Sequence, residues 1–182
     1  MIIVALMGKS GSGKSTAEAA LENRDFKRII SYTTRKMRQG EKNHREYHFV
    51  TEEQFDQLIK NNTLVEQAEY NGFRYGAPKP IGAEQYVIVT ETEGVKSFKK
   101  LYGKQVVAIY IDVDDSEISK RLAKRGNTLS KTITERKQVD KDKFSNIENI
   151  ADYIVDGNGD IQSIIRHILH YVEDWCSKNH LK

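Results

Sequence analysis

Residues 8–15 read Gly8-Lys9-Ser10-Gly11-Ser12-Gly13-Lys14-Ser15, and this stretch decides the fold. It fits the pattern G-x-x-x-x-G-K-[ST] in full. The glycines let backbone N–H groups turn toward phosphate oxygens. An apolar run at residues 2–6 precedes the motif, and a helix-forming stretch at residues 15–21 follows it. The motif and its context therefore predict a phosphate-binding loop between a buried strand and a helix N-terminus.

The polar residues of this loop carry the expected chemistry. Lys14 can reach the β- and γ-phosphates of a nucleotide, and the hydroxyl of Ser15 can ligate Mg²⁺. We expect the phosphates to lie against Gly8, Ser10, Gly11, Ser12, Gly13, Lys14, Ser15 and Thr16. A phosphate loop alone does not distinguish a kinase from a nucleotide-driven switch or motor. The short chain and its later stretch rich in Arg and Tyr favour an enzyme with a second substrate.

The composition limits the other classes of function. The chain has 182 residues, of which 38% are hydrophobic and 30% charged, and this suits one compact domain. A net charge of +3 does not by itself indicate nucleic-acid or membrane binding. The lone Cys176 excludes an internal disulfide framework, and no apolar run approaches the roughly 18 residues of a membrane span. The N-terminus lacks a basic leader, so we expect a cytoplasmic protein.

Strand-like and helix-like stretches alternate along most of the chain. Runs typical of buried strands occur at residues 2–6, 26–30, 86–90, 106–111 and 153–155. Helical spacing of apolar residues or a capping pattern occurs at residues 15–21, 95–101, 115–125, 132–144 and 161–172. This alternation predicts an α/β fold with a mainly parallel sheet flanked by helices.

Residues 31–80 break the alternation. Residues 47–50 and 63–70 alternate between apolar and polar side chains, which predicts short antiparallel strands. Between them Thr51 can cap a helix that carries Phe55 and other apolar residues. We therefore expect an inserted subdomain here.

Four ordered motifs carry a more specific signal. They are Ser31-Tyr32-Thr33-Thr34-Arg35-x-x-Arg38-x-Gly40-Glu41, Glu46-Tyr47-x-Phe49-Val50, Val65-Glu66-x-Ala68 and Gly72-x-x-Tyr75-Gly76. Together with the phosphate loop they resemble the guanylate kinase family, over nearly the whole chain. The resemblance implies a single P-loop kinase domain over residues 1–182. Its parts would be a core (1–30, 81–125 and 137–182), an NMP-binding insert (31–80) and a short lid (126–136).

The resemblance also implies a reaction, in which ATP with Mg²⁺ phosphorylates GMP or dGMP to the diphosphate. The residue types agree with this. Arg35 and Arg38 offer planar forks of donors for a phosphate dianion, and Tyr47 and Tyr75 can add hydroxyl donors. Glu66 can accept from guanine N1–H and N2–H₂, a donor pair that adenine lacks. The family places a serine hydroxyl on the base, here Ser31. We expect the protein to act as a monomer or homodimer.

Two further arginines belong to the expected catalytic set. The stretch Arg121-Leu122-x-x-Arg125-Gly126 resembles the entrance to the family's lid, and Arg136 matches its returning arginine. With Lys14, Arg125 and Arg136 would stabilise the charge that develops on the transferring phosphoryl group. Arg121 has the alternative reading of a surface helix residue.

The chain departs from the family pattern around the base. Ala77 stands where the family generally has a serine, and Val89 and Glu91 stand where it has two aspartates. Glu91 can still orient the base or a water on Mg²⁺. The departures leave open a related P-loop kinase with another nucleotide or a phosphosugar as acceptor. A non-catalytic guanylate-kinase-like binding module is a further alternative, although Lys14 and Ser15 argue against it.

Overall fold

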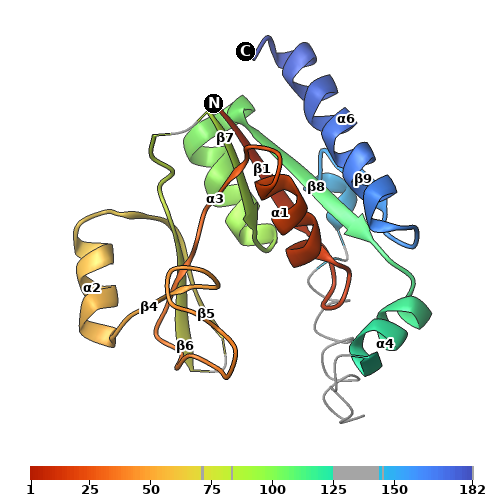
Figure 1. Ribbon diagram of the computed structural model, residues 1–182. Coiled ribbons are helices and arrows are strands. Elements are labelled where there is room, and N and C mark those ends of the chain that lie inside the picture. Colours follow the sequence, from red (N-terminus) through yellow and green to blue (C-terminus); the bar gives the residue numbers. More distant parts are fainter. Residues whose placement is uncertain (71, 83, 125–143, 145, 182) are drawn as a thin grey trace.

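A five-stranded parallel sheet forms the centre of the protein in the computed structural model (Figure 1). The structure describes residues 1–70, 72–82, 84–124, 144 and 146–181. In spatial order the strands are β2 (Lys27–Arg28), β7 (Gln85–Val89), β1 (Ile2–Met7), β8 (Val106–Asp112) and β9 (Tyr153–Asp156). All neighbouring pairs run parallel, which confirms the predicted mainly parallel sheet.

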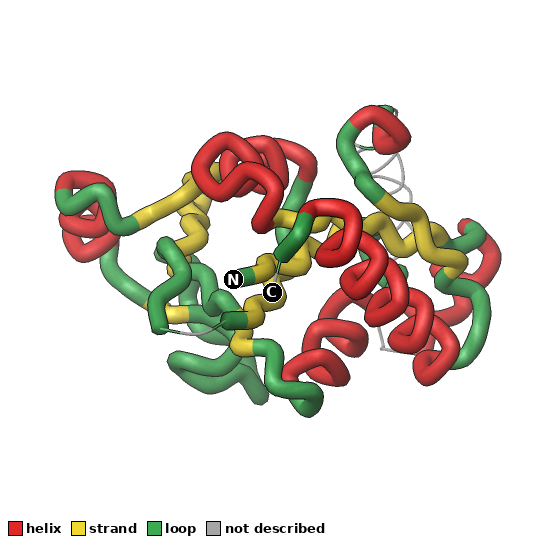
Figure 2. The backbone as a smooth tube through the Cα atoms, turned by 90° about the horizontal axis from the view of Figure 1, so that it is seen from above, coloured by secondary structure: helices red, strands yellow, loops and turns green. Residues whose placement is uncertain are grey.

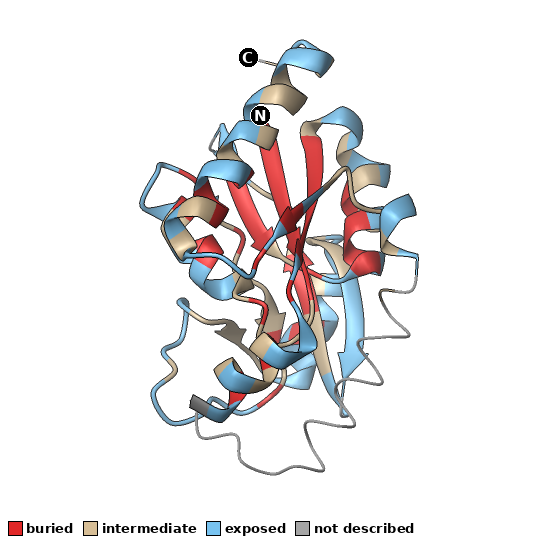
Figure 3. Ribbon diagram, turned by 90° about the vertical axis from the view of Figure 1, so that its right-hand side faces the viewer, coloured by how far each residue is buried: buried red, intermediate tan, exposed pale blue. Residues whose placement is uncertain are grey.

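Helices cover both faces of this sheet. The described helices are α1 (Lys14–Glu22), α2 (Glu52–Lys60), α3 (Thr92–Tyr102), α4 (Asp115–Lys124) and α6 (Ile161–Asn179), with 3₁₀ turns η1 (Gly103–Gln105) and η2 (Ile147–Asn149). Of these, α2 lies away from the central sheet (Figure 1). Val4 and Leu6 of β1 pack into one apolar cluster with residues of α1 and α6. Ile3 and Ala5 point the other way, into a cluster with residues of α3. Because both faces are covered, the central strands are buried along their length (Figure 3).

One predicted helix is longer than expected, and another lies mostly outside the residues that the structure describes. The C-terminal helix continues to Asn179, beyond the apolar repeat that predicts it. Asp160 begins it, with a side chain that accepts from the backbone N–H of Ser163 at 3.0 Å. The helix predicted at residues 132–144 lies almost entirely outside the described residues. None of the described helices is both long and apolar enough to cross a bilayer.

A second sheet is built from residues between 32 and 78. Its order is β4 (His48–Phe49), β3 (Tyr32–Thr33), β6 (Phe73–Pro78) and β5 (Leu64–Tyr70). Antiparallel pairing is confirmed for β5 with β6, and β3 with β6 is also antiparallel. The prediction of antiparallel pairing is wrong for β4, which pairs parallel with β3. The pairing is parallel because residues 34–47 bring the chain back to the start of the sheet before β4 begins.

The helix between β4 and β5 forms as predicted. Thr51 accepts from the backbone N–H of Gln54 at 3.2 Å, and Gln54 accepts from the backbone N–H of Thr51 at 2.9 Å, which completes a capping box. Figures 1 and 2 show α2 at one end of the molecule, far from α6. Between the two sheets, α3 contacts β5. The second sheet therefore meets the core close to the carboxyl end of β7.

Candidate active site

The loop after β1 has the backbone geometry that its sequence predicts. Gly8, Gly11 and Gly13 all have positive φ, at 152°, 88° and 99°. A Cβ at Gly8 would lie 2.6 Å from Ser12 Oγ and 2.8 Å from the carbonyl oxygen of Ile111. No side chain fits there without displacing the loop or β8. The glycines thus allow a tight turn whose backbone faces inward.

The polar groups of this loop suit an anion. Gly13 precedes α1 without a side-chain cap, so the first N–H groups of the helix point into the loop. Among the described residues, the buried hydroxyl of Ser12 has no hydrogen-bond partner, with the residue 1% exposed. Lys14 Nζ donates to the carbonyls of Gly8 (2.7 Å) and Lys9 (2.9 Å), and so folds over the loop. Together these groups fit the phosphates of a nucleotide.

Two hydroxyls lie on the first turn of α1. Ser15 and Thr16 are both exposed there. A hard cation such as Mg²⁺ prefers oxygen ligands, and it keeps several waters when it bridges phosphates. The Ser15 hydroxyl, adjacent to Lys14, therefore fits a magnesium ion held mainly by nucleotide phosphates. Among the described residues, no group of three or more His, Cys, Asp or Glu side chains could hold a metal by itself.

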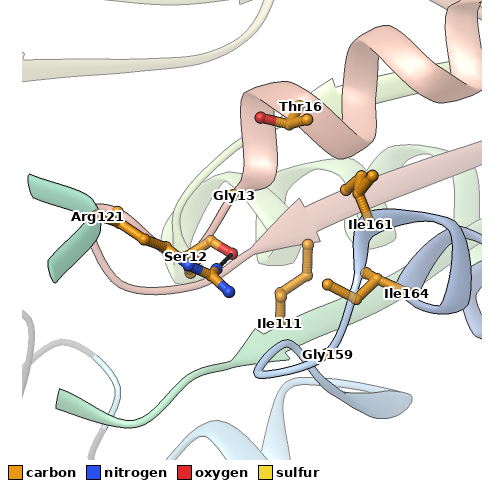
Figure 4. A pocket seen from close by; sticks show the side chains of 9 residues that line it. Ser12, Gly13, Thr16, Ile111, Arg121, Gly159, Ile161 and Ile164 are labelled. Atoms are coloured by element: carbon orange, nitrogen blue, oxygen red, sulfur yellow. Dashed lines mark hydrogen bonds between the residues drawn. The ribbon is translucent and has the colours of Figure 1, made fainter. Parts of the chain in front are cut away.

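A cavity of about 300 Å³ opens beside the phosphate loop (Figure 4). Its lining residues are Gly11, Ser12, Gly13, Thr16, Ile111, Arg121, Gly159, Ile161 and Ile164. The isoleucines come from β8 and from α6, and they give the cavity an apolar wall. Such a wall next to a phosphate site suits a planar base.

Arg121 of α4 reaches from this cavity to two separate loops. Its Nη1 donates to the carbonyl of Ser12 at 3.3 Å, and its Nη2 donates to the carbonyl of Gly157 at 2.9 Å. Its Nε donates to Glu117 at 3.1 Å on the same helix. These contacts hold the partly exposed guanidinium of Arg121 between the phosphate loop and the loop before α6.

Arg35 lies just after β3 and is 8% exposed. Its Nη2 and Nη1 donate to the two carboxylate oxygens of Glu41 at 2.9 and 3.0 Å, and Nη1 also donates to the carbonyl of Lys36 at 2.7 Å. The guanidinium stands 5.4 Å from the ring centroid of Tyr47 and 5.5 Å from that of Phe49. A buried, oriented guanidinium of this kind suits a phosphate.

Two tyrosines stand beside Arg35. The rings of Tyr47 and Tyr75 meet edge to face, with centroids 5.8 Å apart. Hydrogen bonding to Glu41 and Tyr75 raises the pKa of Arg35. Burial raises the pKa of Tyr47, so this phenol keeps its proton and can donate. The structure thus brings together three of the predicted phosphate contacts, while Arg38 is exposed and adjoins them through its backbone N–H, which donates to Glu41 at 2.7 Å.

Glu66 lies on β5, directly opposite Ala77 on β6. Thr90 Oγ1 donates to Glu66 Oε1 at 3.4 Å. Burial raises the pKa of the Glu66 carboxyl, the Thr90 hydrogen bond lowers it, and the charge of Glu91 raises it. The carboxylate thus sits in a half-buried position where a hydrogen bond to a base would be strengthened.

The remaining predicted site residues are less closely tied to this cluster. Ser31 is half-buried just before β3, and its carbonyl accepts from the backbone N–H of His48 at 2.9 Å. Glu91 is exposed at the N-terminal end of α3. Arg125 and Arg136 lie outside the described residues.

At three residues of the site the structure adds contacts that the sequence alone does not predict. Glu41 belongs to a quoted motif, but only the structure gives it the task of holding Arg35. Arg121 has a helix position that also suits the surface. Thr90 has one signal in the sequence, a hydroxyl at the end of an otherwise apolar strand.

Comparison with known proteins agrees with this geometry. The family model described as guanylate kinase matches residues 1–175. A guanylate kinase of Lactobacillus johnsonii is 32% identical over 181 residues, which cover 94% of this chain and 88% of that protein. One of Onion yellows phytoplasma is 33% identical over 165 residues, covering 85% and 77%. The crystal structure of guanylate kinase from Anaplasma phagocytophilum matches with a TM-score of 0.73 at 25% identity, over 95% of this chain and 85% of that one. The phosphate loop, the second sheet with its arginine and glutamate, and these matches together place the chain in the guanylate kinase family.

Proposed function

We propose that this protein transfers the γ-phosphoryl group of ATP to GMP, and also to dGMP, giving ADP and the diphosphate. The observation that carries the proposal is a second cluster of hydrogen-bond donors, separate from the phosphate loop. In it the buried Arg35, just after β3, stands beside Tyr47 and Tyr75, and β3 belongs to the same small sheet as the strand that carries Glu66. A phosphate clamp and a base-reading carboxylate on one sheet suit a purine nucleoside monophosphate.

On the donor side, the loop would hold ATP through its backbone and hydroxyls. The residues in contact would be Gly8, Ser10, Gly11, Ser12, Gly13, Lys14, Ser15 and Thr16. The adenine would enter the cavity against Ile111, Ile161 and Ile164. Ser15 would ligate Mg²⁺, which neutralises charge on the phosphates when it is bound.

On the acceptor side, Arg35, Arg38, Tyr47 and Tyr75 would bind the phosphate of GMP. Glu66 would accept from guanine N1–H and N2–H₂, and Ser31 and Glu91 would complete the contacts to the base. Opposed charges at the two ends fix the orientation of the acceptor, so that its phosphate oxygen faces the donor.

Chemistry would then depend on cations placed around the transferring group. Lys14 can follow the γ-phosphoryl, and Arg125 and Arg136 would add planar, multi-donor groups as negative charge spreads over its oxygens. We further propose a cytoplasmic enzyme that acts as a monomer or homodimer, in keeping with its single cysteine and small net charge.

A coupled assay of ADP formation tests the proposal. Wild-type protein with ATP and Mg²⁺ should phosphorylate GMP and dGMP much faster than AMP, CMP, UMP or a phosphosugar. Glu66→Gln replaces an acceptor with a donor that faces a guanine N–H. It should reduce the preference for GMP over AMP in kcat/KM by about 1–3 kcal/mol.

Glu69→Gln is the matched control, because it makes the same change at an exposed position on the same strand. Its GMP to AMP ratio should equal that of the wild type. The proposal fails if no guanine nucleotide is phosphorylated. If the GMP to AMP ratio of kcat/KM is the same in wild type, Glu66→Gln and Glu69→Gln, then only the assignment of Glu66 as the base reader fails.

A further inference from the structure

Thr90 joins the two sheets at the point where the proposed acceptor site meets the phosphate loop. Its backbone N–H donates to the carbonyl of Leu6 at 3.1 Å, in the strand that leads into the loop. Its hydroxyl donates to Glu66 Oε1 at 3.4 Å, in the second sheet. The residue is only 8% exposed. One buried residue thus connects the strand that carries the phosphate loop, through its backbone, with the proposed base reader, through its side chain.

Gly94 provides the space for this contact. A Cβ at Gly94 would collide with Thr90 Oγ1, and it would lie 3.1 Å from Glu66 Oε2. Gly94 is in the first turn of α3, where any residue can adopt the backbone conformation, so the glycine is needed for room. The hydroxyl and the carboxylate therefore pack together against the helix backbone.

The chemistry of the site requires an ionised and oriented Glu66. A carboxylate must be charged, with both oxygens toward the base, to accept from N1–H and N2–H₂ together. Burial works against the charge, and so does Glu91, the charged group that acts on Glu66 from the N-terminus of α3. Ala77, directly opposite, has no polar side chain to help. Within the described residues, the side-chain hydrogen bond to this carboxylate comes from Thr90.

We propose that Thr90 is a positioning residue, which orients the Glu66 carboxylate so that both of its oxygens read the base. The inference rests on the proposed function. It makes Thr90 a determinant of selectivity for purines with a 2-amino group, because a carboxylate that can rotate still accepts from N1–H but loses the second, simultaneous contact. Thr90 itself does not touch the nucleotide in this role.

The test compares Thr90→Val, which removes the hydroxyl and keeps the shape, with Thr90→Ser, which keeps the hydroxyl. IMP is the probe, because hypoxanthine has N1–H and lacks the 2-amino group. In Thr90→Val the KM for GMP should rise about fivefold to tenfold, the range for a modest hydrogen bond to a charged group. The kcat and the KM for ATP should change less than about twofold, and the GMP to IMP ratio of kcat/KM should fall by roughly fivefold. Thr90→Ser should restore all of these values.

A pH profile gives a second readout. Removing a donor that stabilises the charged carboxylate raises the pKa of Glu66. The acidic limb of kcat/KM for GMP should therefore move to higher pH in Thr90→Val and return in Thr90→Ser. Thr92→Val is the matched control. It removes the same hydroxyl group two residues away, at a position that is also buried, with 9% of Thr92 exposed. It should leave the ratio and the limb in place.

The outcomes separate this inference from the proposed function. If wild-type protein fails to phosphorylate GMP, the proposed function is wrong and the role of Thr90 falls with it. If wild type turns over GMP but Thr90→Val and Thr90→Ser behave alike, only the Thr90 role is wrong. The role of Thr90 is also wrong if Thr90→Val lowers kcat/KM equally for GMP and IMP and leaves the acidic limb of the pH profile in place. Thermal unfolding checks the fold, and Thr90→Ala replaces Thr90→Val if valine disturbs the packing against Gly94.

Discussion

Arg35 and Glu41 form a two-point contact, with 2.9 Å between Nη2 and Oε1 and 3.0 Å between Nη1 and Oε2. The same carboxylate accepts from the backbone N–H of Arg38 at 2.7 Å. One acidic side chain therefore fixes the guanidinium of the first arginine and the backbone of the second. Both lie where we propose that the acceptor phosphate binds, so the loop is organised before any nucleotide arrives.

Glu41→Gln should show a pH-dependent loss of stability. The hydrogen bond from Arg35 lowers the pKa of Glu41 in the folded protein. Its stabilisation is therefore present above the unfolded-state pKa of about 4.3 and is lost as the pH falls through the folded-state pKa. The variant should unfold about 1 kcal/mol more easily than wild type at pH 7. In urea unfolding the difference should shrink as the pH falls below about 4.

Glu46→Gln serves as the control for this change. Glu46 lies in the same loop and, like Glu41, accepts from a backbone N–H, that of Lys42 at 2.6 Å. Its ion pair, however, is 3.6 Å long and is made with the exposed Arg45, so the comparison isolates the contact with the buried Arg35. If Glu46→Gln lowers the free energy of unfolding at pH 7 as much as Glu41→Gln does, then removing any charge from this loop has the same effect, and the contact with Arg35 is not special.

Lys14→Met should remove activity and spare the fold. Nζ contacts two loop carbonyls, whereas the loop itself is held by its glycine backbone and by the packing of β1 and α1. We expect kcat to fall on the order of 10³-fold, because the charge opposite the transferring phosphoryl is lost. Turnover and thermal unfolding measured on the same preparation check this. Lys9→Met is the control, because it removes another cation of the same loop, one that pairs with Asp115 of α4. Its kcat should fall far less than that of Lys14→Met.

The sequence predicts those parts of the molecule whose causes are local. The phosphate loop follows from three glycines and a lysine, and the parallel sheet follows from short apolar runs that alternate with helical spacing. The helix cap at Thr51 depends on a contact between residues three apart. Each of these signals is complete within a few residues.

The features that the sequence did not predict depend on contacts between distant segments. The parallel pairing of β4 with β3 is set by the path of residues 34–47. Arg121 acquires its contacts only where α4 crosses the phosphate loop and the loop at Gly157. Thr90 meets Glu66 only when the second sheet packs on α3, and no local pattern in the sequence encodes that distance.

Ala77→Ser tests whether the base pocket lacks a contact. Ala77 is fully buried and opposite Glu66, so a hydroxyl added there would face the same space as the proposed base reader. If guanine occupies that space, the KM for GMP should fall by a factor equivalent to roughly 0.5–1.5 kcal/mol, the usual net value of a hydrogen bond. An unchanged or higher KM in steady-state assays would mean that the hydroxyl finds no partner on the nucleotide.

Arg121→Ala should weaken the donor side alone. The guanidinium ties the carbonyl of Ser12 to that of Gly157, across the cavity where we propose that adenine binds. Without it the two loops lose a shared donor, and the apolar wall of the cavity is no longer held against the phosphate loop. The KM for ATP should therefore rise roughly tenfold. The KM for GMP should stay close to wild type, because the hydrogen bonds that Arg121 makes within the described part of the chain go to Glu117, Ser12 and Gly157.

Lys120→Ala is the matched control for Arg121→Ala. It removes a neighbouring cation, 71% exposed, that shares Glu117 as a partner at 3.6 Å. Initial rates over a matrix of ATP and GMP concentrations separate the two Michaelis constants. If Arg121→Ala instead lowers kcat by a large factor with the KM for ATP intact, then Arg121 acts on the transferring phosphoryl group, as we propose for Arg125 and Arg136, and the cavity is not what it organises.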